Sequence, residues 1–179
     1  MDVPMKRPEI LAPAGNFEKM KAAILYGADA VYLAGQIFGM RAAADNFSLD
    51  ELSEAVAYAH ARGVRVYLTV NTMPREYEYD ALRAYLGALA PIGIDALIVA
   101  DIGVLMLVRE LLPSMEIHLS TQANAVSSAA CRAWASLGVR RIVLARELTL
   151  DEIVAIRREI PDNVKEKIDE YLCRKRKKS

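Results

Sequence analysis

The chain has 179 residues, which at roughly 150 residues per domain is enough for one domain with a full core. Hydrophobic residues make up 54% and charged residues 26%, a composition that excludes a disordered chain. Basic and acidic residues both number 23, but residues 163–179 hold seven basic and three acidic side chains. Only this basic tail, and not the body of the chain, therefore favours contact with nucleic acid.

No segment indicates a secreted or membrane protein. The amino-terminal stretch MDVPMKRPEILAPAGN lacks the apolar run of a signal peptide. The most apolar window, 86–108, contains Pro91, Asp95 and Asp101, and each Asp at the centre of a bilayer costs about 2.5–3.5 kcal/mol. Two cysteines cannot make a disulfide framework or an all-cysteine metal site. We therefore expect a soluble, cytoplasmic protein with no membrane partner.

One phrase recurs along the chain and predicts the order of the elements. It occurs as GADAVYLA (27–34), GVRVYLTV (63–70), GIDALIVA (93–100) and GVRRIVLA (138–145). Each copy begins with a glycine, which suits the left-handed position that ends a helix, and continues as an apolar strand. Periodicity predicts helices over 17–26, 49–62, 77–90, 102–112 and 127–137, and two further strands over 9–12 and 116–119. Capping boxes at Ser48–Glu51 and Thr149–Glu152 predict the start of the second helix and of a sixth.

Apolar strands that alternate with amphipathic helices are typical of a parallel sheet covered by helices. A doubly wound nucleotide-binding sheet should have a glycine-rich turn after its first strand, but the turn here reads APAGN. The near-equivalent units favour an α/β fold of the (β/α) TIM-barrel type. Since a closed barrel needs eight strands and about 250 residues, we expect an incomplete or open barrel of six units over 1–161, with a smaller open sheet as the alternative. Residues 162–179 are predicted to form an amphipathic helix and a basic tail.

Polar residues follow every predicted strand, at the end where a parallel barrel places its reaction site. The candidate ligand-binding residues are Asn16, Arg41, Asn71, Asp101, Gln122, Arg146 and Glu147. Asn16 and Asp101 suit helix N-caps equally well, whereas the others are poor caps or precede the cap. The long loop 35–47 is predicted to be a lid or binding loop, or else a short helix over the barrel mouth.

Other chemistries find little support in the sequence. Neither His60 nor His118 belongs to an HExxH zinc pair, and we expect no metal site. Ser120 is two residues from His118, but alternate strand residues share a face without being placed as nucleophile and base, and no GxSxG elbow occurs. Cys131, in a predicted helix, is interpreted as a buried, inert thiol. The residues alone assign no catalytic group.

Several of these segments together resemble one known family. The segments PEILAPAGN, GADAVYLAG, LSTQ and VLAREL, spread without obvious gaps over about residues 7–156, are similar to the collagenase-like peptidases. This is the thirty-second family of peptidases with unassigned catalytic type. The resemblance implies a (β/α) barrel and, by the family label, a hydrolase, because members were first described as collagen-degrading proteases.

The resemblance also implies a different chemistry. Other members are proteins for oxygen-independent hydroxylation of RNA or quinones, several with an iron–sulfur cluster and with prephenate as the oxygen source. In those relatives, further strands lead to a cysteine-rich region that holds the cluster. A cluster needs about four thiolates, which Cys131 and Cys173 cannot supply. We therefore expect no cofactor in this chain, an iron–sulfur cluster in full-length relatives, and a tail after Pro161 that is unrelated to the family.

Three hypotheses on function remain. The first is a truncated family member with a ligand site at the carboxyl ends of the strands, where Arg41 and Arg146 offer forked donors to a small carboxylated ligand or a peptide. The second is a non-catalytic scaffold. The third is a fragment of an RNA-hydroxylation protein, whose basic tail contacts RNA phosphates. In each case the two open sheet edges, 9–12 and 140–144, predict a homo-oligomer.

Overall fold

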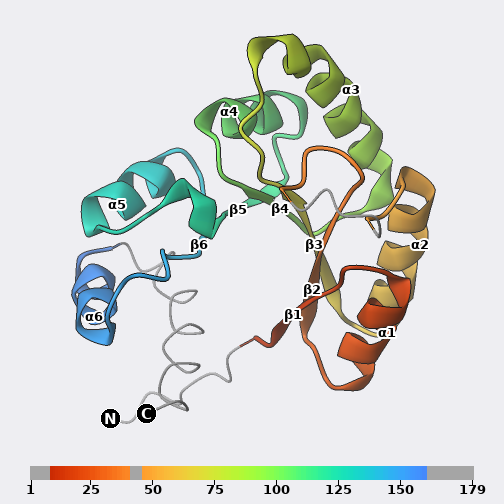
Figure 1. Cartoon of the computed structure of the whole chain (residues 1–179), viewed down its shortest axis with the longest axis horizontal. Helices are drawn as coiled ribbons and strands as arrows, with labels where there is room; N and C mark the ends of the chain where they lie inside the picture. The colour runs from red at the N-terminus through yellow and green to blue at the C-terminus, as the bar shows by residue number, and fades with distance from the viewer. Residues whose placement is uncertain (1–8, 41–45, 161–179) are drawn as a thin grey trace.

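The computed structural model describes residues 9–40 and 46–160. Six parallel strands form one sheet in the order of the chain, β1-β2-β3-β4-β5-β6. The strands are β1 (Leu11–Pro13), β2 (Ala30–Ala34), β3 (Arg65–Val70), β4 (Ala96–Val99), β5 (Glu116–Leu119) and β6 (Arg141–Ile142). The sheet curls into a half-barrel whose first and last strands lie at its two ends (Figure 1). The prediction of an incomplete TIM-barrel-like fold with six βα units is confirmed.

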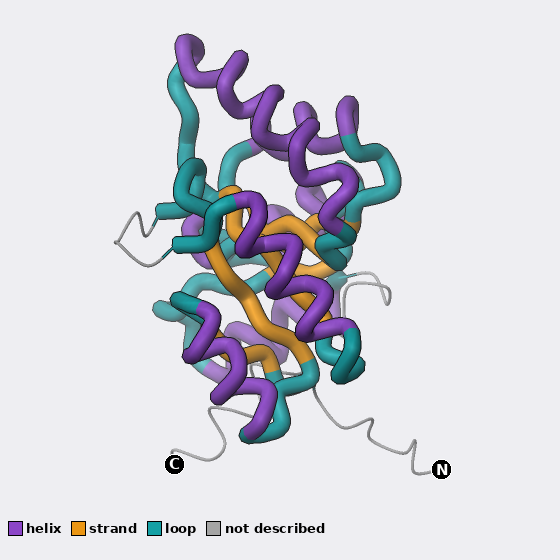
Figure 2. Tube along the Cα trace, turned by 90° about the vertical axis from the view of Figure 1, so that its right-hand side faces the viewer, coloured by secondary structure: helices purple, strands orange, loops and turns teal. Residues whose placement is uncertain are grey.

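One helix follows each strand and lies outside the curve of the sheet, as the side view shows (Figure 2). The helices are α1 (Phe17–Leu25), α2 (Leu49–His60), α3 (Tyr79–Leu89), α4 (Ile102–Leu111), α5 (Ser128–Ser136) and α6 (Leu150–Glu159). Short 3₁₀ turns, η1 (Glu76–Glu78) and η2 (Ala90–Ile92), flank α3, and η3 (Thr121–Ala123) precedes α5. Within the described residues, no helix is long and apolar enough to cross a membrane.

Local sequence signals explain where the helices begin and end. Both predicted capping boxes are present, at the starts of α2 and α6. In the first, the Ser48 hydroxyl accepts from the backbone of Glu51 at 3.3 Å, and the Glu51 carboxylate accepts from the backbone of Ser48 at 2.8 Å. The recurring glycines have positive φ angles of 69° to 88° after α1, α2, α3 and α5. These glycines end the helices, as the recurring phrase predicts.

The two faces of the sheet bury different side chains. On the outer face, Leu33, Leu68 and Leu97 are fully buried against the helices and belong to the main hydrophobic core. Complete burial of such a side chain stabilises the fold by about 1.5–3 kcal/mol. On the inner face, Tyr67 and Ile98 form a second, smaller cluster with Ala30, Ala96 and the flanking Leu11 and Tyr32. The inner face is therefore partly filled by its own side chains.

The two edge strands differ from the prediction, and their hydrogen bonds explain why. The first strand was expected over 9–12, but the backbone N–H of Ile10 donates to the Asp29 side chain at 2.8 Å, and the ladder with β2 begins at Leu11. The sixth was expected over 140–144, and the N–H groups of Arg140 and Val143 do donate to β5, at 2.9 and 3.0 Å, but that of Ala145 donates to Ala125 at 3.2 Å, outside the sheet. Only Arg141–Ile142 remain as β6. The predicted helix and tail over 162–179 lie outside the described residues, so the predicted domain boundary stays a prediction.

Candidate functional site

Two of the predicted site residues meet at the carboxyl end of the sheet. Asn71 follows β3, Gln122 lies in the η3 turn after β5, and the Asn71 Nδ2 amide donates to Gln122 Oε1 at 2.5 Å. The Ser120 hydroxyl donates to the same Gln122 oxygen at 3.2 Å. Strand β4 lies between β3 and β5, so the two amides span about 10 Å of sheet edge. The small, buried Ala100 follows β4 between them.

The loop after β2 lies against this amide pair. The backbone N–H of Met40 donates to Asn71 Oδ1 at 3.1 Å, and that of Thr72 donates to the Phe38 carbonyl at 3.4 Å. Phe38 has a φ angle of +59°, a conformation that costs a non-glycine residue energy and is held here by these contacts. Arg41 lies outside the described residues, but its neighbour Met40 brings the chain to Asn71. The described part of loop 35–47 thus lies against the amide pair, and its role as a lid or binding loop stays a prediction.

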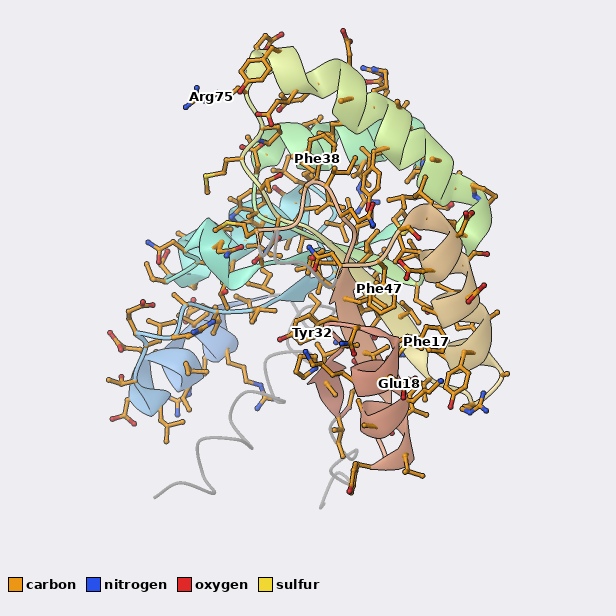
Figure 3. All side chains as sticks on the ribbon, turned by 45° about the vertical axis from the view of Figure 1, so that its right-hand side comes forward. Phe17, Glu18, Tyr32, Phe38, Phe47 and Arg75 are labelled. Atoms are coloured by element: carbon orange, nitrogen blue, oxygen red, sulfur yellow. The ribbon has the colours of Figure 1, made fainter. Side chains whose placement is uncertain are left out.

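Close packing fixes the start of this loop. Gly35 follows β2 and pairs with Phe47 in an isolated bridge. A Cβ atom at Gly35 would lie 2.1 Å from the Tyr85 hydroxyl of α3, so any other residue there would force the Tyr85 side chain to move. The Phe38 ring packs on Tyr85 at 5.7 Å between centroids, and Figure 3 shows Phe38 on the loop close to α3. Burial raises the pKa of Tyr85 to about 12, so the phenol is neutral at physiological pH.

Asn16 and Asp101 both serve as helix N-caps. The Asn16 side chain accepts from the backbone of Lys19 at 2.9 Å at the start of α1. Asp101 accepts from the backbone of Val104 at 3.0 Å at the start of α4, and also raises the pKa of the neighbouring Tyr79, after the larger effect of burial. The capping alternative therefore accounts for one bond of each side chain. Their role toward a ligand stays a prediction.

Arg146 and Glu147 follow β6 and are exposed. Neither has a hydrogen bond to Asn71 or Gln122 among the described residues. The structure therefore joins Asn71, Gln122 and the Met40 backbone, whereas Arg146 and Glu147 follow the edge strand β6, next to β5. Their role toward a ligand stays a prediction. Sequence reasoning missed the contribution of Tyr85. This residue belongs to α3 in the outer layer of helices, and its side chain packs against Gly35 and Phe38 of the loop after β2. A glycine directly after a strand is the signal for such a close approach.

The polar groups of β5 do not form a hydrolytic pair. The Ser120 hydroxyl donates to Gln122, while His118 Nε2 lies 2.7 Å from the Glu116 carboxylate. No group of three or more His, Cys, Asp or Glu side chains that could hold a metal ion occurs within 9–40 and 46–160. Cys131 is fully buried, and burial raises the pKa of its thiol to about 11. A buried, protonated thiol does not suit a cluster ligand, so the described residues do not fit an iron–sulfur cluster.

Curated relatives resemble the chain in sequence. It is 39% identical over 168 residues to tRNA hydroxylation protein P1 of Bacillus subtilis, covering 94% of this chain and 40% of that protein. It is 42% identical over 158 residues to tRNA hydroxylation protein P of Escherichia coli, covering 88% of this chain and 35% of that protein. The chain thus spans two fifths or less of the length of these relatives.

A solved structure resembles it in fold. The U32 peptidase Mk0906 superposes with a TM-score of 0.72 at 16% identity, over 90% of this chain and 68% of that one. The sequence pattern of peptidase family U32 matches residues 15–173. This match extends beyond Ile156, where the resemblance was expected to end, so the tail is not wholly unrelated to the family. The chain belongs to peptidase family U32.

Proposed function

We propose that this chain forms the ligand-binding part of an RNA-hydroxylation protein of the U32 family, and that the Asn71–Gln122 pair binds a small carboxylated ligand. One observation carries the proposal: two neutral amides from β3 and β5 meet at the carboxyl end of the barrel, beside the loop after β2. The names of the curated relatives support RNA hydroxylation over proteolysis. Ser120 and His118 are not placed as a nucleophile and its base, so this pair offers no mechanism for peptide hydrolysis.

The chemistry of the amides suits a carboxylate. Gln122 Oε1 accepts from both Asn71 and Ser120, which turns the amide so that its Nε2 group has no partner among the described residues. A carboxylate accepts from such N–H donors, and hydrogen bonds to charged groups are about twice as strong as neutral ones. The predicted site residues Arg41 and Arg146 are the proposed sources of positive charge for this ligand. The proposed ligand class is therefore a small organic acid, with prephenate as the probe.

The proposal is tested by titrating the 179-residue chain with prephenate in a calorimeter. Gln122→Glu replaces an amide donor with a carboxylate of the same shape, and we expect it to weaken binding at least about tenfold. Ala22→Glu is the control, because it adds the same negative charge at an exposed position within α1, outside the loop and the amide pair. Equal loss in both variants would indicate a general charge effect, and absence of prephenate binding by the unaltered chain would refute the proposed ligand.

A further inference from the structure

A network of charged side chains lies inside the half-barrel, at the end opposite the amide pair. Glu9, just before β1, forms an ion pair with Arg141 of β6 at 2.6 Å, and a second ion pair with Arg65 of β3. The Tyr67 hydroxyl of β3 donates to both Glu9 oxygens, at 3.0 and 3.1 Å. We call these four residues the ionic latch.

The central pair of the latch is shielded from solvent. The side chains of Glu9 and Arg141 are 8% and 5% exposed, whereas that of Arg65 is 50% exposed. The Arg141 guanidinium also lies 5.3 Å from the centre of the Tyr67 ring, and the Tyr67 and His118 rings pack edge to face with their centroids 4.6 Å apart. His118 in turn bonds to the Glu116 carboxylate. The Glu9–Arg141 pair is therefore packed into the interior and is not a pair of surface charges.

The pair joins the two ends of the sheet. Glu9 and Arg141 are 132 residues apart, and β1 and β6 are the first and last strands in the sheet order. Five strand spacings in a flat sheet would separate them by about 24 Å. Extended glutamate and arginine side chains with a hydrogen bond between them reach only roughly 14 Å. The ion pair can form only when the sheet is curled.

We propose that the ionic latch is a conformational device that holds the half-barrel in its curled state by tying the strand before α1 to the strand before α6. Within the described residues, no backbone ladder joins β1 to β6, so the side chains supply the tie between the two edges. Burying two charges is costly, and a buried ion pair stabilises poorly compared with apolar packing. Its geometric effect, a fixed separation of the edges, accounts for this arrangement.

A distance measurement between the two ends of the sheet tests the proposal. Spin labels are placed at Glu18 of α1 and Arg158 of α6, both exposed, after Cys131 and Cys173 are replaced by alanine. Figure 3 shows Glu18 on α1. Pulsed electron paramagnetic resonance should give one narrow distance in this background. In Glu9→Gln the distribution should broaden and its mean should lengthen by about one strand spacing, roughly 5 Å.

Three further variants separate the latch from general destabilisation. Glu110→Gln is the control, because it breaks an Arg83–Glu110 pair of the same 2.6 Å length that is exposed and joins two neighbouring helices; the distance should not change. Glu9→Asp keeps the charge but shortens its reach, so the tie to Arg141 is lost and the distance between the labels should lengthen. This variant provides the test if Glu9→Gln does not fold. Glu9→Gln/Arg141→Met leaves no lone buried charge and should still show the longer distance.

Two outcomes would overturn the proposal. One is an unchanged distance distribution in Glu9→Asp and in folded Glu9→Gln. The other is a return of the narrow distance in Glu9→Gln/Arg141→Met, since that result would assign the opening to an uncompensated charge and not to a lost tie.

Discussion

The contact between Gly35 and Tyr85 allows a sharp test of how the second strand is joined to the outer helices. Replacing Gly35 with alanine adds a Cβ atom 2.1 Å from the Tyr85 hydroxyl and 3.2 Å from its ring carbon Cζ. Ordinary carbon contacts begin near 3.5 Å, so the Tyr85 ring has to move by more than 1 Å. That ring is 6% exposed and packs on Phe38. We expect Gly35→Ala to lower the free energy of unfolding by about 2–3 kcal/mol, the range of overpacked cores.

The Tyr85 hydroxyl supplies the clash, so its removal should relieve most of the cost. The hydroxyl has no hydrogen-bond partner among the described residues, and Tyr85→Phe alone should therefore change the free energy of unfolding by less than about 1 kcal/mol. In Gly35→Ala/Tyr85→Phe the remaining ring carbon is tight but tolerable. The double variant should thus be more stable than the sum of the single effects predicts, by about 1.5 kcal/mol or more.

Urea unfolding followed by the fluorescence of Trp134, the single tryptophan, measures these changes. With a slope of about 2 kcal/mol per molar urea, Gly35→Ala should lower the midpoint by about 1 M. Gly87→Ala is the matched control, because its Cβ would meet no atom within 4 Å and it lies inside α3. It should stabilise the chain by about 0.5–1 kcal/mol. Additive effects of Gly35→Ala and Tyr85→Phe would refute the proposed contact.

Two further predictions concern buried titratable groups. Burial raises the pKa of Tyr85 from 10.0 to about 12, so the stability that this group contributes is complete below pH 10 and is lost as the pH rises toward 12. A plot of unfolding free energy against pH should therefore fall less steeply in Tyr85→Phe, by up to about 2–3 kcal/mol over this range; parallel curves would contradict it. Burial also raises the pKa of the Cys131 thiol to about 11. In a Cys173→Ser chain, a thiol reagent at pH 8 should modify Cys131 only after denaturant is added, and rapid modification of the folded chain would contradict its burial.

The order of strands and helices followed from the sequence because local patterns determine it. The glycine phrases, the apolar runs and the capping boxes at Ser48 and Thr149 each act over fewer than ten residues, and the structure contains all of them. The edges of the sheet were harder to place. Asp29 takes the Ile10 amide, and Ala125 takes the Ala145 amide. Such competing acceptors depend on the tertiary arrangement and leave no local pattern.

The candidate site was predictable as an edge of the sheet but not as a set of contacts. Parallel strands bring their carboxyl ends together, which placed Asn71 and Gln122 on one edge. Their bond to each other depends on side-chain reach across β4, which no spacing in the sequence encodes. The latch was missed for the same reason. Arg65 and Arg141 looked like polar steps ahead of an apolar run, and only the curl of the sheet turns them onto Glu9.

The amino ends and the carboxyl ends of the strands hold polar groups of different kinds. This difference bears on which of them can give up a side-chain contact for a ligand. β3 carries Arg65 at its amino end, and Asn71 follows its carboxyl end. A buried charge that loses its partner costs several kcal/mol, so Glu9 and Arg141 cannot exchange each other for a ligand. A neutral amide pair contributes only about 1 kcal/mol, and a carboxylate bound at the Gln122 Nε2 group, as proposed, would separate no buried ion pair. The ionic end is therefore suited to holding shape, and the amide end to binding.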